Sequence, residues 1–422
     1  MNQLLPTRVR GTEDLLSMAS WNAVCDVIKS VLKIHVFAEI RTPSIEKTEL
    51  FVRAVGTDTD IVSKEMYTFT SVSEGSICLR PELTAPMVRA FYENSVDVSP
   101  WKVFQFGPAF RHERPQKGRL RQFYTCSIEV MNAPSVGHDI SAIVMLDRIF
   151  KALDLKDYVL NLNFLGVASD RAAHRTALRD FLCVNDEKLC EMCRFRRDKN
   201  VLRVFDCKNE ACQALYVNAP QLSYYFSADS SAEWERIKKE LMLLSVNYIQ
   251  NPMLVRGLDY YNGVVFEFTS NALGSQSTFC GGGRYDLSQS LGKKELLPSV
   301  GAGIGLDRVM MILEAQNNPL ATQSSPNKLI AIVPMDEAQE SLSLQLSHTL
   351  FYAGLASEII FDGAGMKQKM RRADKLNAAF ALVLGDREAA AGVAMVKDMA
   401  TGESFEIALR DIAGILKQKL SL

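Results

Sequence analysis

The densest group of residues able to do chemistry lies at residues 110–123, between two apolar and aromatic stretches. It carries one anion, Glu113, and five cations: Arg111, Arg114, Lys117, Arg119 and Arg121. The planar guanidinium fork of arginine suits phosphate oxygens. Charge runs are commonly solvated surfaces, but Pro115 and Gly118 fix a turn here and Phe123 adds an aromatic ring. The segment therefore predicts binding of a nucleotide or a nucleic acid.

Two further polar groups lie in apolar or turn-rich surroundings. Glu82 and Thr84 occur where a helix is expected to begin, so a carboxylate and a hydroxyl could both face one ammonium group. Helix capping explains Glu82 equally well. Arg256 lies in an apolar stretch, where an unpaired charge is costly. It therefore needs an anion, which is Asp259, Glu267 or a substrate.

Glycines are concentrated at residues 281–283 and 301–305, and the second run leads into Asp307 and Arg308. Glycine allows a ligand to approach the backbone closely. Neither run has the spacing of a phosphate loop or of a dinucleotide-binding turn, and close packing of two strands explains the glycines equally well.

Four cysteines have the spacing C-x2-C-x13-C-x4-C: Cys190, Cys193, Cys207 and Cys212. This spacing is compatible with a tetrahedral zinc site. The alternative is four free thiols in a helical subdomain, because the second pair is wider than the usual C-x2-C.

Composition limits the class of protein. A chain of 422 residues suggests two or three domains, and 47% hydrophobic with 23% charged residues excludes a disordered chain, a collagen-like repeat and a small disulfide scaffold. With a net charge of −1, any nucleic-acid binding must come from local patches. No uncharged apolar run approaches the roughly 18 residues that span a bilayer, and the nine cysteines indicate free thiols. We expect a cytoplasmic protein without membrane association.

Hydrophobic periodicity predicts the elements that position these groups. We expect helices at residues 18–35, 84–94, 139–153 and 306–315, and strands at 101–110, 122–131 and 254–268. The first two strands could pair around the basic loop. The polar segment 317–328 indicates a linker, and the alternating strands and helices after it indicate an α/β domain.

In this order, the groups resemble the motifs of histidyl-tRNA synthetases, which are class II aminoacyl-tRNA synthetases. A helix and strand ending in Arg41-Thr-Pro resemble motif 1, residues 110–119 match motif 2, and residues 303–308 match motif 3. Arg256-Gly-Leu-Asp-Tyr-Tyr and Gly282-Gly-Arg-Tyr-Asp resemble the two signatures particular to the histidine enzyme. The resemblance covers essentially the whole chain.

The resemblance implies an α+β fold: a class II catalytic domain built on an antiparallel sheet, a helical insertion and a C-terminal α/β anticodon-binding domain. The expected boundaries are 1–168 and 251–316 for the catalytic domain, 169–250 for the insertion, 317–328 for the linker and 329–422 for the anticodon-binding domain. It also implies a homodimer that uses ATP with Mg²⁺ to ligate L-histidine to its tRNA through a histidyl-adenylate.

The resemblance assigns the ATP contacts to Arg111, Glu113, Arg119, Arg121, Phe123 and Arg308. Phe123 would stack on adenine, and Arg308 would contact the γ-phosphate. Arg111 and Arg256 would contact the α-phosphate and the histidine carboxylate. They would be the catalytic residues, because attack of an anion on a polyanion needs positive charge at the α-phosphate.

The histidine pocket implied by the resemblance consists of Glu82, Thr84, Arg111, Thr125, Glu129, Arg256, Tyr260 and Tyr261. Glu129 and Tyr261 would bind the two imidazole nitrogens, which would reject amino acids lacking them. The chain departs from the family at Thr125, where glutamine usually helps to hold the α-ammonium, and at Leu287, where glycine usually follows.

The implied tRNA contacts lie at two places. Arg114 and Gln116 would reach the acceptor end, and residues 366–375, with five cations and one anion, would add a basic patch. A solvated helix face is the alternative for that patch. Two other readings of the whole chain are the regulatory subunit of an ATP phosphoribosyltransferase, which keeps a histidine pocket, and an RNA-binding protein without activity.

Overall fold

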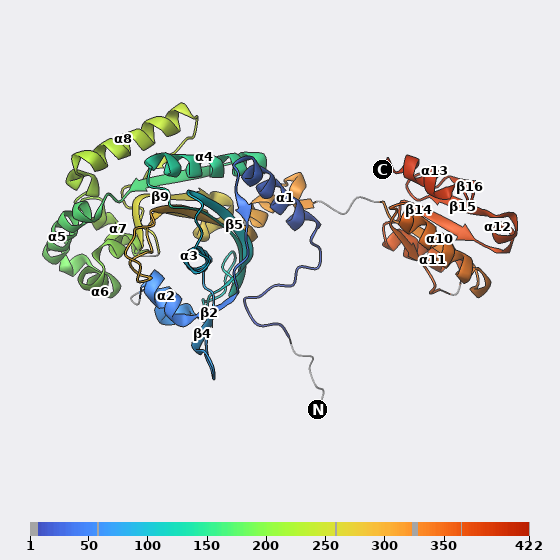
Figure 1. Ribbon diagram of the computed structural model, residues 1–422, viewed down its shortest axis with the longest axis horizontal. Helices are drawn as coiled ribbons and strands as arrows, with labels where there is room; N and C mark the ends of the chain where they lie inside the picture. The colour runs from blue at the N-terminus through green and yellow to red at the C-terminus, as the bar shows by residue number, and fades with distance from the viewer. Residues whose placement is uncertain (1–6, 57–58, 258–259, 323–327, 364, 422) are drawn as a thin grey trace. The chain divides into compact units, whose positions relative to one another are not determined.

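The computed structural model describes residues 7–56, 59–257, 260–322, 328–363 and 365–421. The chain divides into two compact units, Met1–Gln323 and Ser324–Leu422 (Figure 1). The predicted linker at 317–328 contains this boundary, although its residues 323–327 lie outside the described part of the chain.

The first unit is built on an eight-stranded sheet. In spatial order its strands are β1 (Ala38–Glu39), β5 (Trp101–Phe110), β6 (Gln122–Met131), β11 (Ser299–Gly305), β10 (Thr278–Tyr285), β9 (Tyr261–Ser270), β7 (Tyr158–Phe164) and β8 (Ile249–Gln250). All neighbours are antiparallel except the edge pairs β1–β5 and β7–β8. The prediction of a catalytic domain on an antiparallel sheet is confirmed.

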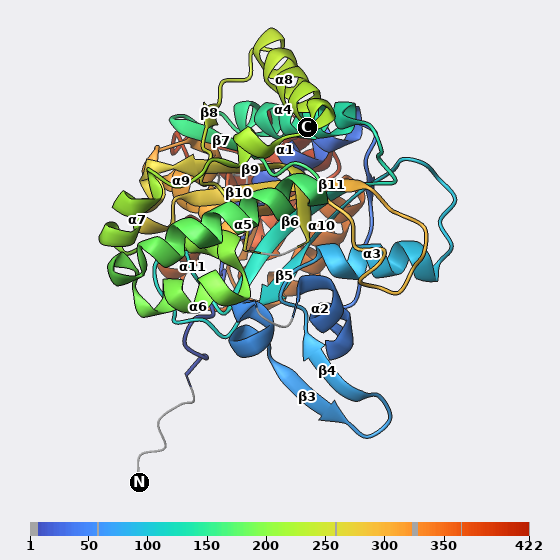
Figure 2. The same cartoon turned by 90° about the vertical axis from the view of Figure 1, so that its left-hand side faces the viewer.

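One face of this sheet is covered by helices. They are α1 (Ala19–Ile34), α4 (Val136–Ala152), α8 (Ala228–Leu243) and α9 (Leu306–Ala315), and α1, α4 and α8 lie on the same side of the sheet in both ribbon views (Figures 1 and 2). The helix predicted at 18–35 is confirmed. Its side chains at Val24, Ile28 and Leu32, four residues apart, are buried in a core shared with Phe150 and Phe268.

The opposite face carries α2 (Thr48–Val55) and α3 (Thr84–Glu93) over a second core that includes Phe51, Met87, Val103 and Met131. A small sheet in the order β2 (Ile45–Lys47), β4 (Gly75–Leu79), β3 (Thr68–Ser71) adjoins it. Figure 2 shows the β3–β4 hairpin projecting from the body of the unit. Short helical turns complete this unit at η1 (Ile61–Glu65), η5 (Asn271–Gln276) and η6 (Pro319–Thr322).

Two strand predictions have different outcomes. Strands β5 and β6 pair from Trp101 opposite Met131 to Phe110 opposite Gln122, which confirms the expected hairpin around the basic loop. The strand expected at 254–268 begins only at Tyr261. The described residues before it, 254–257 and Tyr260, form no strand, and the side-chain amide of Asn163 donates to the carbonyls of Pro252 and Leu254.

Helices occupy the chain between β7 and β8, and none of these residues, all of them described, forms a strand. The elements are α5 (Ala168–Val184), η2 (Asp186–Lys188), α6 (Glu191–Lys199), η3 (Val201–Asp206), α7 (Glu210–Tyr216), η4 (Leu222–Tyr225) and α8. Leu178, Val204 and Leu215 belong to a separate core in this region. Helix α8 instead joins the sheet, since Trp234 stacks on Phe164 of β7.

The second unit is an α/β domain, as predicted. Its sheet has the order β13 (Ser357–Ile359), β12 (Ile330–Pro334), β14 (Phe380–Leu384), β15 (Val393–Asp398), β16 (Ser404–Ala408), with the first three strands parallel. Its helices are η7 (Glu337–Gln339), α10 (Glu340–Tyr352), α11 (Met366–Lys375), α12 (Asp386–Ala391) and α13 (Ile412–Lys419). Among the described residues, no helix is both long and apolar enough to cross a membrane.

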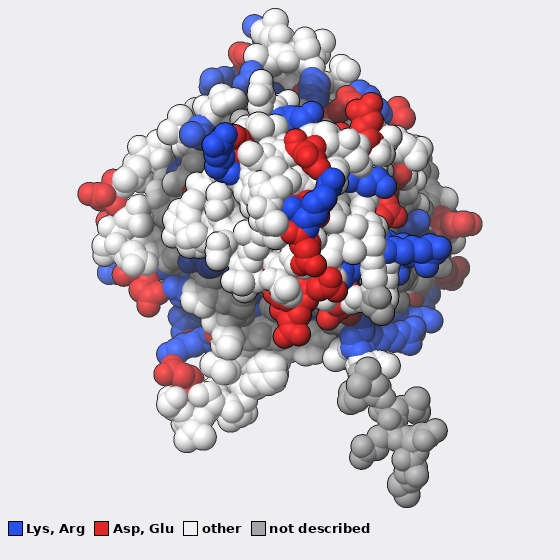
Figure 3. Space-filling view, turned by 90° about the vertical axis from the view of Figure 1, so that its right-hand side faces the viewer, with Lys and Arg blue, Asp and Glu red and all other residues white. Residues whose placement is uncertain are grey.

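The predicted basic patch is carried by α11, with one correction. Lys369 is buried, and its ammonium donates to the carbonyl oxygen of Pro334 at 2.6 Å, so this cation holds the helix on β12. Lys367, Arg371, Arg372 and Lys375 are exposed. On the face shown in Figure 3, acidic side chains interleave with basic ones.

Candidate active site

Strand alternation places three polar residues of β6 on one face of the large sheet. Thr125, Ser127 and Glu129 are all buried and point away from the helical face, where Cys126 and Ile128 are packed. The same face carries the opening of a cavity, so β6 supplies one polar wall.

The two central strands supply a floor without side chains. Gly303 of β11 lies opposite Ser127, and Gly301 lies opposite Glu129. On the next strand, Gly281 and Gly283 pair with Gly303 and Gly301. The two glycine runs therefore form one patch of bare backbone between β6 and β9.

That bare backbone leaves room for charged side chains that arrive from other elements. A Cβ atom at Gly301 would lie 1.7 Å from Oε2 of Glu129, and one at Gly281 would lie 2.4 Å from Nη1 of Arg256. Both distances are too short for any real contact. Glycine is therefore required at positions 281 and 301 because any side chain there would overlap the Arg256 guanidinium or the Glu129 carboxylate. Close packing of the two strands is not the main reason.

The cavity over this floor has a volume of about 230 Å³. The predicted residues that line it are Glu82, Thr84, Arg111, Glu113, Arg119, Phe123, Thr125, Arg256, Tyr260, Tyr261 and Arg308. Glu129 is fully buried directly behind the lining residues Thr84 and Ser127. Arg121, Arg114 and Gln116 are not among its lining residues.

Three hydroxyl groups hold the Glu129 carboxylate. Thr84 Oγ1 donates to Oε1 at 2.7 Å and Ser127 Oγ donates to the same oxygen at 3.0 Å. The hydroxyl of Tyr285 donates to Oε2 at 2.7 Å. Burial raises the pKa of Glu129 to about 7, although these three hydrogen bonds lower it. The group can therefore exchange a proton near neutral pH.

This pKa predicts a stability change with pH. In the unfolded chain the carboxyl titrates near 4.5, so between pH 4.5 and 7 the native state binds the additional proton. The free energy of unfolding should therefore fall as pH rises through this interval, by about 3 kcal/mol from this group. Urea unfolding of the unliganded full chain at pH 5 and pH 8 measures it.

Glu129→Gln is the matched variant, because it cannot titrate. Its loss of stability between the two pH values should be smaller than that of the wild type by about the same 3 kcal/mol. Burial also raises the pKa of Asp139 to about 7, but Asp139 is present in both proteins and contributes equally. Equal pH dependence in the two proteins would refute the assignment.

Glu82 caps the helix that follows it. Its two carboxylate oxygens accept hydrogen bonds from the backbone N–H groups of Thr84, at 2.7 Å, and of Ala85, at 2.8 Å. The alternative that Glu82 caps the helix is therefore confirmed. The residue still lines the cavity and is 8% exposed, so the same carboxylate fixes the helix start and faces a ligand.

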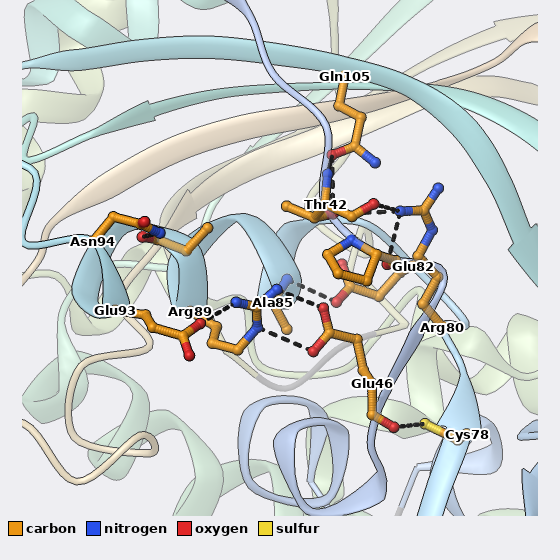
Figure 4. Close-up of polar contacts among 12 residues, drawn as sticks. Thr42, Glu46, Cys78, Arg80, Glu82, Ala85, Arg89, Glu93, Asn94 and Gln105 are labelled. Atoms are coloured by element: carbon orange, nitrogen blue, oxygen red, sulfur yellow. Dashed lines mark hydrogen bonds and ion pairs between the residues drawn. The ribbon is translucent and has the colours of Figure 1, made fainter.

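Arg80, two residues before Glu82 and not singled out in the sequence, anchors this segment to neighbouring backbone (Figure 4). This fully buried guanidinium donates from Nη1 to the carbonyls of Thr42 and Pro43, at 2.9 and 3.0 Å, and from Nε to the carbonyl of Pro108 at 2.9 Å. Gln105 in turn accepts from Thr42. In the sequence, the one feature that could have indicated this role is an arginine that follows an apolar strand and directly precedes Pro-Glu.

Arginines from the motif-2 and motif-3 segments, Arg111 and Arg308, also line the cavity. Arg111 donates from Nε to the carbonyl of Pro81 at 3.0 Å and lies over the ring of Phe123. Arg308 donates from Nε to the carbonyl of Gly118 at 2.9 Å. Each guanidinium keeps further donors, so the cavity can bind an anion with several phosphate groups.

Glu113 and Arg119 form an ion pair within the basic loop. Arg121 lies outside the cavity, and its Nε donates to the carbonyl of Glu113 while its backbone N–H donates to Gly11. The backbones of Gln116 and Arg119 pair to close the tip of the loop. Arg114 is exposed.

Arg256 is paired with Glu267 of β9, so a protein anion is present next to it. Glu267 also accepts from the hydroxyl of Thr278 at 2.9 Å. The other proposed partner, Asp259, lies outside the described residues. The guanidinium lines the cavity and lies over the ring of Tyr261, and its buried Nε has no hydrogen-bond partner.

The tyrosines form a cluster in the lining of the cavity and behind it. The ring of Tyr260 lies 4.7 Å from that of Tyr261 and 5.4 Å from that of Tyr285, measured between centroids. Sequence reasoning named Tyr260 and Tyr261 but missed Tyr285, which bonds to Glu129. A buried tyrosine hydroxyl needs a hydrogen-bond partner, so a tyrosine in an apolar strand could have been predicted to bond to a buried polar group.

Comparison with known proteins identifies the family. The family model described as histidyl-tRNA synthetase matches residues 11–309, and the one described as anticodon binding domain matches residues 329–419. This chain belongs to the histidyl-tRNA synthetase family. The predicted class II fold and the predicted ligase class are confirmed.

Relatives of similar length support this membership. The histidine–tRNA ligase of a Geobacillus species is 39% identical over 420 residues, which cover 98% of this chain and 99% of that protein. The histidine–tRNA ligase of Thermosipho melanesiensis is 37% identical, covering 97% of this chain and 98% of that one. The apo histidyl-tRNA synthetase structure from Staphylococcus aureus superposes with a TM-score of 0.82 at 28% identity and covers 98% of this chain and 100% of that chain.

In this histidyl-tRNA synthetase family member, the departure at Thr125 has a defined geometry. The hydroxyl donates its hydrogen to the carbonyl of Ile304 at 3.0 Å, on the strand where Gly305 lies opposite Thr125. Because the donor is used, the oxygen can only accept from a ligand. The other departure, Leu287, is buried beside the tyrosine cluster. The four cysteines lie together in the helical region, outside the lining of the cavity.

Proposed function

We propose that this chain activates L-histidine and transfers it to its tRNA. A carboxylate oxygen of histidine attacks the α-phosphorus of ATP, and pyrophosphate leaves with the cleaved bond. A ribose hydroxyl at the end of the tRNA then attacks the carbonyl carbon of the adenylate, and AMP leaves. The observation that carries the proposal is a cavity lined by arginines and tyrosines, with a buried carboxylate bonded to a tyrosine hydroxyl directly behind the lining.

The arginines would act on the charges of the first step. Arg111 and Arg256 would neutralise the histidine carboxylate and the α-phosphate, whose mutual repulsion opposes attack. Arg308 would bind the γ-phosphate, with Glu113, Arg119 and Arg121 shaping the loop near the nucleotide. Phe123 would stack on adenine. The position of Arg256 in the lining of the cavity supports its role as a ligand-facing cation.

Mg²⁺ would accompany ATP, since this ion binds phosphate oxygens together with one or two carboxylates. Glu113 lines the cavity beside the arginines and offers the oxygen donors that this ion prefers. When bound, the ion would offset charge on the departing pyrophosphate.

The tyrosines and Glu129 would select histidine. Glu129 would accept from one imidazole nitrogen, and Tyr261, with Tyr260 beside it, would bind the other. Glu82, Thr84 and Thr125 would hold the α-ammonium. The hydroxyl oxygen of Thr125, having donated its hydrogen, suits an ammonium donor and so compensates for the missing family glutamine.

The location, the oligomeric state, the tRNA contacts and the domain boundaries are proposed from membership of the family. We propose a cytoplasmic homodimer in which Arg114 and Gln116 reach the tRNA acceptor end, while the second unit binds the anticodon. We also propose the catalytic, insertion, linker and anticodon-domain boundaries predicted from the sequence. Exposed apolar side chains on the projecting sheet, Ile45, Phe69 and Val72, support a subunit interface, and nine free cysteines fit a reducing compartment.

The regulatory subunit of an ATP phosphoribosyltransferase is the competing candidate of the same fold. A Bacillus halodurans protein described as such a subunit or histidyl-tRNA synthetase superposes with a TM-score of 0.63 at 18% identity and covers 89% of this chain and 97% of that chain, so the fold alone does not separate them. Retention of Arg111, Arg256 and Arg308 together with the matched anticodon domain favours the ligase.

ATP–pyrophosphate exchange against a panel of amino acids tests the proposal. The purified chain should exchange label with histidine and with no other amino acid, because both imidazole nitrogens are bound. Measurable histidine binding without exchange would instead favour the regulatory subunit.

A further inference from the structure

The four cysteines meet at one point of the helical region. Cys190 precedes α6 and Cys193 lies within it, Cys207 follows η3, and Cys212 lies in α7. Their four Sγ atoms all lie within 4.8 Å of one another. Segments separated by up to 22 residues therefore bring their sulfurs together.

The spacing of the sulfurs fits a single tetrahedral ion. Zinc–sulfur bonds of about 2.3 Å separate the sulfurs of a tetrahedral site by about 3.8 Å. The Sγ atoms of Cys190 and Cys207 are 3.8 Å apart. An iron–sulfur cluster, the other common partner of four cysteines, inserts several atoms between the sulfurs and needs more room. A disulfide joins only two of the four and needs a much closer pair.

Packing alone does not explain the arrangement. Cys193, Cys207 and Cys212 are buried among Leu178, Val204 and other apolar side chains, as free cysteines often are. A packed core needs small apolar groups but does not need four sulfurs directed at one another.

Backbone N–H groups lie where they would stabilise thiolates at two of the four sulfurs. The backbone N–H of Cys190 donates to Sγ of Cys212 at 3.3 Å, and that of Asn209 donates to Sγ of Cys207 at 3.4 Å. Such donors stabilise negative charge on metal-bound sulfur. Cations also outnumber acids across residues 188–212, which offsets the charge of a four-thiolate site.

We propose that Cys190, Cys193, Cys207 and Cys212 bind one Zn²⁺ as a structural site. Binding releases the four thiol protons to solvent and leaves a site with a net charge of two negative units. All four positions are filled by protein, so the ion stabilises the fold and does no chemistry on substrate.

The site also has a link to the cavity. Arg203 lies in η3, between Cys193 and Cys207, and its Nη1 donates to the backbone carbonyl of Arg256 at 3.1 Å. Its Nε pairs with Asp206 at 3.1 Å. Zinc would fix both ends of the segment that carries Arg203. Resting on the proposed function, this makes zinc a support for the position of Arg256.

Metal content tests the site independently of activity. The full chain, purified under reducing conditions, should contain about one zinc ion per chain, and Cys207→Ser should lose it. Cys183→Ser removes an exposed cysteine of α5 outside the cluster and is the matched control, which should keep the zinc. A wild-type chain without zinc, or equal zinc in both variants, would overturn the proposal.

A second measurement covers the case in which Cys207→Ser fails to fold. Wild-type protein stripped by a chelator should take up one equivalent of Zn²⁺. With Co²⁺ it should show the intense visible bands of a tetrahedral site and sulfur-to-cobalt charge-transfer bands. A Co²⁺ spectrum without those bands, or a disulfide within the cluster under the same conditions, would contradict the proposal.

The link to the cavity has its own test. Arg203→Gln should keep its zinc but raise the KM for histidine in pyrophosphate exchange by about 3- to 10-fold. Lys199→Gln, which changes an exposed cation at the end of α6, should match the wild type. An unchanged KM in Arg203→Gln would refute the link. Bound zinc in a protein that activates no amino acid would leave the metal site intact and reject the proposed function.

Discussion

Replacing Arg256 by glutamine is expected to lower kcat for histidine-dependent pyrophosphate exchange by about 10²- to 10³-fold. The guanidinium lies on the glycine floor at Gly281 and has a buried Nε without a partner. Glutamine removes the charge that offsets repulsion between the histidine carboxylate and the α-phosphate. Exchange assays at saturating ATP and histidine measure this loss.

A double variant separates catalysis from a purely structural ion pair. Arg256→Gln leaves the partly buried Glu267 without its cation, so this variant should also lose stability. Adding Glu267→Gln should recover much of that stability, because the unpaired charge is gone. It should not recover exchange. If exchange returns with stability in the double variant, Arg256 serves only to pair with Glu267.

Local periodicity was sufficient to predict the elements that hold the arginines. The ten-residue strands β5 and β6 are long, apolar and separated by a turn, so their pairing follows from the sequence. The same holds for α1, whose apolar residues repeat at helical spacing. By contrast, β16 and α13 went unpredicted, since each is short and is stabilised by packing in the second unit.

Strand order is the information that the sequence lacked. Alternation shows that Ser127 and Glu129 share a face, but not that β11 and β10 lie beside β6 and present glycines to them. Tyr285 reaches Glu129 from 156 residues away, so local spacing cannot reveal their hydrogen bond. The burial of Lys369 is likewise a tertiary effect, because only β12 supplies the carbonyl that accepts from it.

The resemblance to a known family filled part of this gap. It named Glu129 and Tyr261 as parts of one pocket although their own surroundings in the sequence are apolar strands. It did not indicate what holds Glu129, which is the role of Thr84, Ser127 and Tyr285. Those contacts come from the three-dimensional arrangement alone.

The glycine floor leads to the second large effect: Gly301→Ala should destabilise the protein by about 1–3 kcal/mol and raise the KM for histidine. The new Cβ would lie 1.7 Å from Oε2 of Glu129 and 2.9 Å from the carbonyl oxygen of Ile128. The carboxylate is held by three hydroxyls and cannot move without breaking hydrogen bonds. Urea unfolding and exchange kinetics measure the two effects.

Gly303→Ala on the same strand is the matched control. Its Cβ would meet only Oγ1 of Thr125, at 3.6 Å, which is an ordinary contact. Alanine in a strand interior is otherwise favoured over glycine by about 0.5–1 kcal/mol. If the glycines merely suit strand packing, both variants should change stability alike. A steric role for Gly301 requires that only Gly301→Ala be destabilised.

Removing the carboxylate should relieve the clash. In a background of Glu129→Ala, the added methyl group at position 301 has lost its nearest neighbour, so Gly301→Ala should cost much less stability there than in the wild type. The coupling between the two substitutions then measures the conflict between one methyl group and one buried carboxylate. If the two substitutions have additive effects on stability, the clash is with the carbonyl oxygen of Ile128 and not with Glu129. Gly301 would then be needed for close approach to the β6 backbone and not for the histidine pocket.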